Sequence, residues 1–188
     1  HNKKQNSLYM LSEGIITAYG VISIEKFLEM TKSLDEKVLD KLENYYKKDF
    51  RIEEKQVISP KLTNKKRIEK YYKNQKLKEF TKKEFESLGE LNYHHNIKSY
   101  KKLIKMLKNN YVFKNSDIMY IDKVIVIPYL YNSLNEEEKA NKDLEETIIK
   151  LFEFKGDKLK QKMLEEIKNV RDYFPIWEYR GYSKNEVK

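Results

Sequence analysis

The 188-residue sequence contains no cysteine, which excludes disulfide bonds, thiolate catalysis, iron–sulfur clusters and cysteine-type zinc sites within these residues. It has only five glycines and three prolines, too few for many tight hairpins, so helices joined by short polar turns are favoured. No apolar run of about 18 residues exists, and we expect no membrane span. The first residues lack the pattern of a secretory signal. With neither signal nor span, we expect a cytoplasmic protein. The chain begins at His1 rather than Met, so we also expect a processed or trimmed start.

Arginine is scarce: the chain has 35 lysines and only four arginines. An AT-rich coding sequence produces the same bias, so the net charge of +9 does not by itself indicate a polyanion partner. The location of the charge is more informative. Residues 1–60 carry 10 basic and 10 acidic side chains, residues 61–110 carry 15 and 5, and residues 111–188 carry 14 and 15. The positive excess therefore lies in the middle of the chain.

Hydrophobic residues make up 39% of the sequence, enough for a core, and their spacing predicts a mainly α fold. Residues 1–60 are predicted to form a winged-helix-like block, in which three helices precede a short β-ribbon that ends at Pro60. Ser23 and Ser33 are expected to cap the second and third helices, the latter through a capping box. The helices are predicted at Ser7–Tyr19, Ile24–Lys32 and Leu34–Lys48, and the strands at Phe50–Ile52 and Gln56–Ser59.

Residues 61–110 are predicted to form a basic helical connector. Its basic stretch, residues 64–80, is expected to be an exposed helix or linker with little to bury, followed by a helix that Thr81 opens with a capping box and Gly89 ends and by an amphipathic helix at Ser99–Asn109. Residues 111–188 are predicted to form a helical bundle. Within it, Val124–Ile127 has the composition of a strand, but the helical spacing of the apolar residues continues past Pro128 and favours a kinked, buried helix. Two further helices are expected at Leu134–Phe154 and Asp157–Tyr173.

The strongest functional indication is a basic stretch with interleaved tyrosines. Lysines that contact phosphates release counterions and give sequence-independent affinity, and tyrosines can stack on bases. We therefore expect a non-enzymatic protein that contacts the nucleic-acid backbone without strong sequence specificity. The alternative reading is a solvated charged face. The candidate nucleic-acid-binding residues are Lys65, Lys66, Arg67, Lys70, Tyr71, Tyr72, Lys73, Lys76, Lys78, Lys82 and Lys83.

Specific reading of DNA by the third predicted helix is not expected. Asp35 and Glu36 in its first turn, followed by Asp40 and Glu43, would face phosphates at close range. Few of its side chains suit the recognition of base edges. The block is therefore interpreted as a unit for packing or protein docking.

Enzymatic chemistry is not indicated. No glycine-rich phosphate loop or metalloprotease motif occurs, and the carboxylate pairs, such as Glu165-Glu166, are interpreted as solvated. His94-His95 is interpreted as a polar loop, because adjacent side chains diverge by about 100° on a helix and make a poor joint ligand set. No metal site and no cofactor are therefore assigned.

The C-terminal residues Trp177-Glu178-Tyr179-Arg180-Gly181-Tyr182-Ser183-Lys184-Asn185-Glu186-Val187 form a recognisable phrase. It resembles the W-x-x-x-G-[YHW]-[ST]-P-x-E ending of uncharacterised bacterial and phage-associated helical proteins, which often continue into a SEC-C-type zinc tail. Lys184 replaces the usual proline, and no cysteine follows. The resemblance implies a helical architecture and no assigned activity.

The same C-terminal residues have a physical interpretation of their own. Trp177 is expected to anchor the helical bundle, Gly181 to allow a left-handed turn, and Ser183 and Glu186 to form a capping box. The alternative is that Trp177 and Tyr182 form an exposed platform for a protein partner, in a protein-interaction or regulatory module, associated with a mobile element, that does not bind nucleic acid.

Overall fold

The computed structural model describes residues 3–32, 37–45, 49–71, 76–111, 113–153 and 155–187. It is mainly helical and contains a small three-stranded antiparallel sheet, which confirms the predicted fold class. The chain divides into two compact units. The N-terminal unit extends to Tyr93 and includes Pro175–Tyr182 and Val187, and the C-terminal unit comprises His94–Phe174 and Ser183–Glu186.

The predicted division at residues 60 and 110 is therefore corrected. The basic segment is not a separate connector, because its helix α4 (Lys65–Glu69) buries Ile68 completely in the N-terminal unit. Trp177 also belongs to the N-terminal unit rather than to the helical bundle. Both α4 and the segment around Trp177 are therefore part of the N-terminal unit, because each buries an apolar side chain there.

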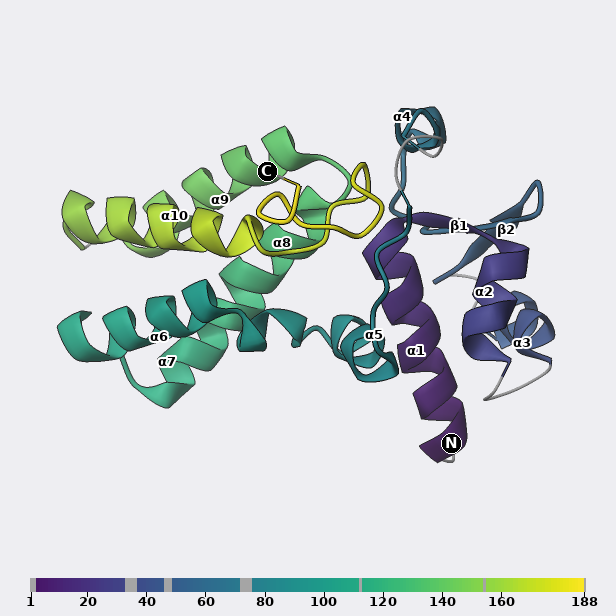
Figure 1. Ribbon diagram of the computed structural model, residues 1–188. Helices are drawn as coiled ribbons and strands as arrows, with labels where there is room; N and C mark the ends of the chain where they lie inside the picture. Colours follow the sequence, from purple (N-terminus) through teal and green to yellow (C-terminus); the bar gives the residue numbers. More distant parts are fainter. Residues whose placement is uncertain are drawn as a thin grey trace. The chain divides into compact units, whose positions relative to one another are not determined.

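The N-terminal unit is built from five helices and three strands in its described residues (Figure 1). The predicted first helix is confirmed, and its apolar stripe from Leu8 to Tyr19 is buried. Ser23 caps the second helix as predicted, accepting a hydrogen bond from the Lys26 backbone N–H. The capping box predicted at Ser33 lies outside the described residues. The elements are α1 (Lys3–Tyr19), β1 (Val21–Ser23), α2 (Ile24–Thr31), α3 (Val38–Tyr45), β2 (Arg51–Glu53), β3 (Gln56–Ile58), α4 and α5 (Lys82–Gly89).

The sheet has the strand order β1-β3-β2, with both pairs antiparallel. The ribbon of β2 and β3 agrees with the prediction, and Glu54 and Lys55 make its two-residue turn with positive φ, as such hairpins require. The sequence analysis did not predict β1. Its three residues are too few to display an alternating pattern, and only their antiparallel pairing with β3 identifies them as a strand.

Helix α1 packs closely against α5, and two glycines make this approach possible. A Cβ atom at Gly14 would coincide with the backbone carbonyl of Phe85, and one at Gly89 would strike the carbonyl oxygen of Met10. The predicted capping box of α5 is confirmed: Glu84 N–H donates to Thr81 Oγ1 at 3.1 Å, and Thr81 N–H donates to Glu84 Oε1 at 2.9 Å. The capping box therefore determines where α5 begins, and packing against α1 determines where the helix lies in the unit.

Trp177 is 1% exposed and anchors the N-terminal unit. Its ring lies over Gly20, where a Cβ atom would come within 2.9 Å of Trp177 Cε2. Gly20 also has a φ of +76°, in the region that favours glycine. The predicted burial of Trp177 as an anchor is confirmed, but in the N-terminal unit and not in the helical bundle. The alternative exposed platform at Trp177 is wrong because the indole is not accessible.

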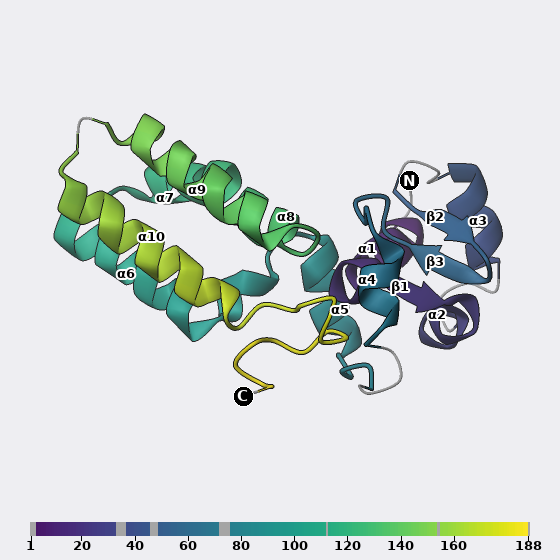
Figure 2. The same ribbon diagram turned by 90° about the horizontal axis from the view of Figure 1, so that it is seen from above.

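The C-terminal unit is helical in its described residues, and α10 packs against both α6 and α9 (Figure 2). The expected helix around Pro128 forms, and the strand alternative at Val124–Ile127 is excluded. None of the described helices is both long and apolar enough to cross a membrane. The elements are η1 (Tyr93–Asn96), α6 (Lys98–Tyr111), α7 (Asn115–Ile121), η2 (Asp122–Val126), α8 (Ile127–Ser133), α9 (Glu137–Leu151) and α10 (Asp157–Arg171).

The middle of this unit contains a wide π turn, η2, between α7 and α8. The Ile127 N–H donates to the carbonyl of Asp122, five residues earlier. Pro128 has no N–H, and its ring would press on the carbonyl four residues before it in a regular α-helix. The wide turn accommodates this proline and gives Asp122 its position at the start of the turn.

Candidate nucleic-acid interface and a histidine–aspartate cluster

The predicted nucleic-acid-binding residues occupy three places in the N-terminal unit. Lys65, Lys66, Arg67, Lys70 and Tyr71 lie on or directly after α4, whereas Lys76 and Lys78 lie on the extended strap, which we define as residues 76–80. Lys82 and Lys83 form the first turn of α5. Tyr72 and Lys73 lie outside the described residues. The basic stretch is thus divided among two helices and a strap.

Two of these cations are paired with carboxylates. Lys65 Nζ lies 2.9 Å from Glu54 Oε2 and 3.6 Å from Glu69 Oε1, and the hydrogen bond to Glu54 raises the pKa of Lys65. Arg67 Nε lies 3.2 Å from Glu178 Oε1. Their charges are therefore partly offset within the protein.

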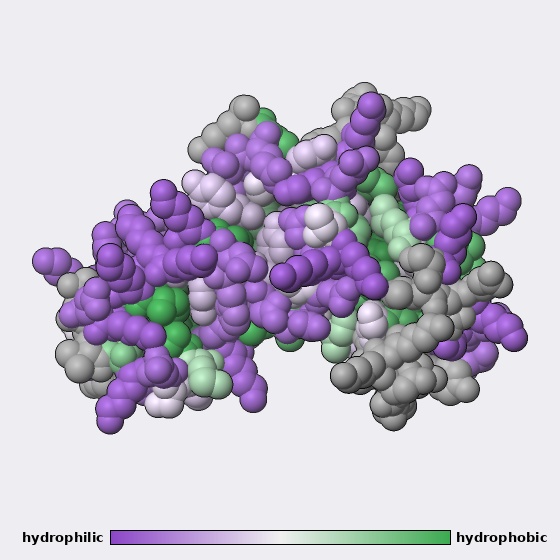
Figure 3. All heavy atoms as spheres, turned by 60° about the horizontal axis from the view of Figure 1, so that its bottom comes forward, coloured by the Kyte–Doolittle hydropathy of each residue, from purple (hydrophilic) through white to green (hydrophobic). Residues whose placement is uncertain are grey.

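Five other lysines among the predicted nucleic-acid-binding residues are exposed and make no ion pair within the described part of the chain. Lys70 Nζ lies over the Tyr71 ring, 5.2 Å from its centroid, so a cation and an aromatic face are presented together. The face of the molecule in Figure 3 is covered mainly by hydrophilic side chains, so hydrophilicity alone does not locate a binding surface. The exposed lysines are Lys66, Lys70, Lys76, Lys82 and Lys83.

A cavity of about 810 Å³ adjoins the strap. Its walls come from the sheet, α2, the strap and Arg180, and they carry four basic side chains and one acidic side chain. Aromatic rings from Tyr19, Phe80 and Phe85 also line it. Sequence reasoning missed Lys26 and Arg180 because both are remote from the basic stretch. The basic residues are Lys26, Lys76, Lys78 and Arg180, and the acidic residue is Glu79.

The strap is held at several points. The Lys78 N–H donates to the Arg180 carbonyl at 2.9 Å, and the Tyr19 hydroxyl donates to the Lys78 carbonyl. Burial raises the pKa of Tyr19, so this hydroxyl stays protonated. Phe80 meets Tyr19 edge-on, with ring centroids 5.9 Å apart. The cavity wall is therefore largely preformed.

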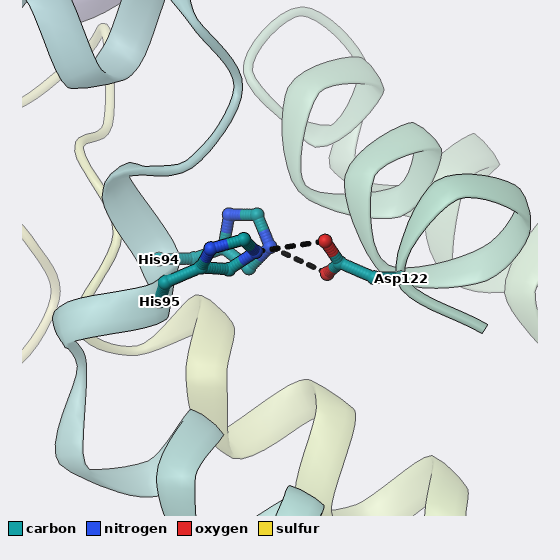
Figure 4. Close-up of side chains that lie close together, drawn as sticks. All are labelled: His94, His95 and Asp122. Atoms are coloured by element: carbon teal, nitrogen blue, oxygen red, sulfur yellow. Dashed lines mark hydrogen bonds and ion pairs between the residues drawn. The ribbon is translucent and has the colours of Figure 1, made fainter. Parts of the chain in front are cut away.

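A second cluster of functional groups lies in the C-terminal unit (Figure 4). His94 Nε2 lies 2.6 Å from Asp122 Oδ1, and His95 Nε2 lies 2.8 Å from Asp122 Oδ2. The sequence predicts that the two adjacent side chains diverge, but both contact the same carboxylate. Both imidazole rings extend from the short helix η1 toward this carboxylate, and each contacts a different oxygen of it.

Tyr100 completes this cluster by donating its hydroxyl to Asp122 Oδ1 at 3.0 Å. Burial and the nearby Asp122 charge raise the pKa of Tyr100, which keeps the donor protonated. Burial also acts to raise the pKa of Asp122, but hydrogen bonds from His94, His95 and Tyr100 outweigh it, and the pKa is lowered. Asp122 is therefore an ionised carboxylate with three donors.

The sequence does contain a signal for Asp122: it is an acidic residue on the apolar face of a helix, four residues after buried Ile118 and three before buried Ile125. Glu166 is a similar case. It was interpreted as solvated, yet it is 3% exposed and lies 3.7 Å from Lys102 Nζ. The burial of each carboxylate results from packing against helices that are distant in sequence, although Glu166 also lies 3.8 Å from Lys162 on its own helix.

Comparison with known proteins adds no assignment. The chain matches no family model, no curated protein and no solved structure. Its functional interpretation therefore depends on the residues and geometry described above.

Proposed function

We propose that the N-terminal unit is a winged-helix domain that binds the backbone of nucleic acid without strong sequence specificity. The proposal is supported by the order of its elements, in which α1, β1, α2, α3, β2 and β3 follow one another and the sheet order is β1-β3-β2. Winged helix-turn-helix domains are common nucleic-acid-binding modules. The absence of an enzymatic function remains a prediction.

One observation carries the proposal furthest: a cavity lined with cations and aromatic rings adjoins the strap, within the same basic stretch that carries the exposed lysines. Lysine ammonium groups attract phosphates, and aromatic rings such as Phe80 can stack on an unpaired base. Lys76 belongs to both features, since it is exposed and lines the cavity. We therefore place the contact surface on α4, the strap and the first turn of α5.

The described part of α3 does not favour base reading. Asp40 and Glu43 are exposed on this helix, and carboxylates repel the phosphates that border a groove. The predicted acidic first turn at Asp35 and Glu36 lies outside the described residues. Backbone contact through the lysine surface is consequently a better fit than insertion of α3 into the major groove.

The test is a salt titration of binding to single- and double-stranded polynucleotides. A variant combining Lys66→Gln, Lys70→Gln and Lys76→Gln removes three exposed charges from the proposed surface. If each contacts one duplex phosphate, the slope of log affinity against log salt should decrease in magnitude by about 2.7. The matched control combines Lys101→Gln, Lys105→Gln and Lys108→Gln, which removes three exposed charges from α6.

The control variant should bind with nearly the wild-type slope. A wild-type slope in the first variant, or equal losses in both variants, would contradict a localised surface. A finer comparison uses neighbouring residues: Lys66→Gln should weaken binding more than Lys65→Gln, because Glu54 and Glu69 already offset the Lys65 charge. Absence of any binding at about 50 mM salt would favour the protein-interaction alternative.

A further inference from the structure

We propose that His94, His95 and Asp122 form a binding site for a divalent transition-metal ion in the C-terminal unit. One ligand atom from each residue lies within 4.8 Å of the other two. Figure 4 shows both imidazole rings directed at the same carboxylate. Two imidazole nitrogens and one carboxylate oxygen are a donor set that suits zinc, iron, nickel or copper better than calcium or magnesium.

The ligand atoms are close enough for metal binding after movement of the side chains. Tetrahedral ligand atoms around zinc are about 3.3 Å apart, because each bond to zinc is about 2.0 Å long. The present separations of 2.6 and 2.8 Å belong to hydrogen bonds. A tetrahedral set therefore needs the two His–Asp separations to lengthen by roughly half an ångström and the widest separation in the cluster, up to 4.8 Å, to shorten. The His95 side chain is 47% exposed, so it has room to make this movement.

The positions of the protons on the two imidazole rings are also compatible with a bound metal ion. The nitrogens that face the ionised Asp122 carry protons as hydrogen-bond donors, and a metal ion would replace those protons at Nε2. An imidazole that binds a metal through Nε2 carries its remaining proton on Nδ1. Tyr100 continues to donate to Asp122 Oδ1, in the manner of the outer hydrogen bonds that orient metal-binding carboxylates.

The surroundings also define the kind of site. Three protein ligands leave a fourth position for water or another ligand, as in zinc sites that are not closed by four side chains. His94 is fully buried, and its Nδ1 has no hydrogen-bond partner among the described residues. In the metal-bound state this nitrogen carries an unpaired N–H, which disfavours binding. We therefore expect micromolar rather than nanomolar affinity for zinc.

The composition makes the test unusually clear. The chain has no cysteine and only three histidines, of which His1 is the third. In a His1→Ala variant of the full chain, any remaining histidine site must involve His94 or His95. Zn²⁺ titration by calorimetry should give one site per chain, and Co²⁺ should produce visible absorption bands without thiolate charge transfer.

Two variants in this background test the ligands. His95→Ala and Asp122→Asn should each weaken Zn²⁺ binding by at least about ten-fold, since each removes a metal ligand. Glu90→Gln is the matched control, because it neutralises an exposed carboxylate outside the cluster, and it should bind like the His1→Ala protein. His95 is half-exposed, so its variant remains informative even if Asp122→Asn does not fold.

The proposal is overturned if the His1→Ala protein binds no Zn²⁺ at millimolar concentration, or if His95→Ala binds as tightly as the background protein. In either case the cluster is a hydrogen-bonded brace. These outcomes are independent of polynucleotide binding, which the lysine variants of the N-terminal unit measure separately.

Discussion

The indole N–H of Trp177 donates a hydrogen bond of 2.8 Å to the backbone carbonyl of Thr17, 160 residues earlier in the sequence. This bond fastens Pro175–Tyr182 to the first helix of the N-terminal unit. Arg180 reinforces the attachment by donating to the Val21 carbonyl at 3.4 Å. The segment near the end of the chain is thus part of the core that also supports the proposed nucleic-acid surface.

Replacing this anchor should unfold the N-terminal unit at lower denaturant concentration. Trp177→Ala removes a fully buried ring and leaves the Thr17 carbonyl without its donor, and we expect a loss of about 3–5 kcal/mol in the free energy of unfolding. Urea denaturation followed by circular dichroism measures it. Tyr173→Ala removes an aromatic side chain that is 46% exposed and should cost much less. Equal losses in the two variants would contradict the anchor role.

The crossing of α1 and α5 can be tested at Gly14. Gly14→Ala places a methyl group against the backbone carbonyl of Phe85, which cannot move without displacing α5. We expect a destabilisation of at least about 1–3 kcal/mol, as for other overpacked cores. Gly156→Ala is the matched control, because a Cβ atom there meets nothing within 4 Å. Thermal unfolding should show a large decrease for the first variant and little change for the second.

The stability of the C-terminal unit should depend on the charge of Asp122. Burial alone would raise the pKa of this carboxyl, but the hydrogen bonds from His94, His95 and Tyr100 lower it below the ordinary value of 3.8. A group with a lowered folded-state pKa stabilises the fold above its unfolded-state pKa. That stabilisation is lost as the pH falls through the folded-state value.

Asp122→Asn should therefore be less stable than the wild type at pH 7, and the difference should shrink as the pH falls below about 4. Urea midpoints measured without metal for both proteins between about pH 3 and pH 7 provide the test. A difference that stays constant over this range would mean that the carboxylate charge does not contribute to stability.

Much of the local structure could be predicted from sequence because local interactions determine it. The capping boxes at Thr81 and Ser183 connect residues three positions apart, and both form. The apolar stripe of α1 is buried as its spacing predicts. Gly181 adopts the expected positive φ of 96°. The resemblance of the C-terminal phrase to a family of helical proteins stays a prediction.

The errors share one cause, which is pairing between distant residues. Strand β1 is identified only by its pairing with β3. Lys65 is among the predicted phosphate contacts, but Glu54, in the turn between β2 and β3, lies 2.9 Å from its Nζ. His94 and His95 were considered without Asp122, which is 28 and 27 residues away in the chain.

The amino-acid sequence by itself determined the helical class, most helix positions and the location of the positive charge, because periodicity, capping and composition act within a few residues. Only the tertiary structure decided which cations remain available, that Trp177 is buried against α1, and that two histidines meet one aspartate. These outcomes depend on which distant surfaces pack together. Side-chain spacing along a single helix or strand carries no information about its partner in space.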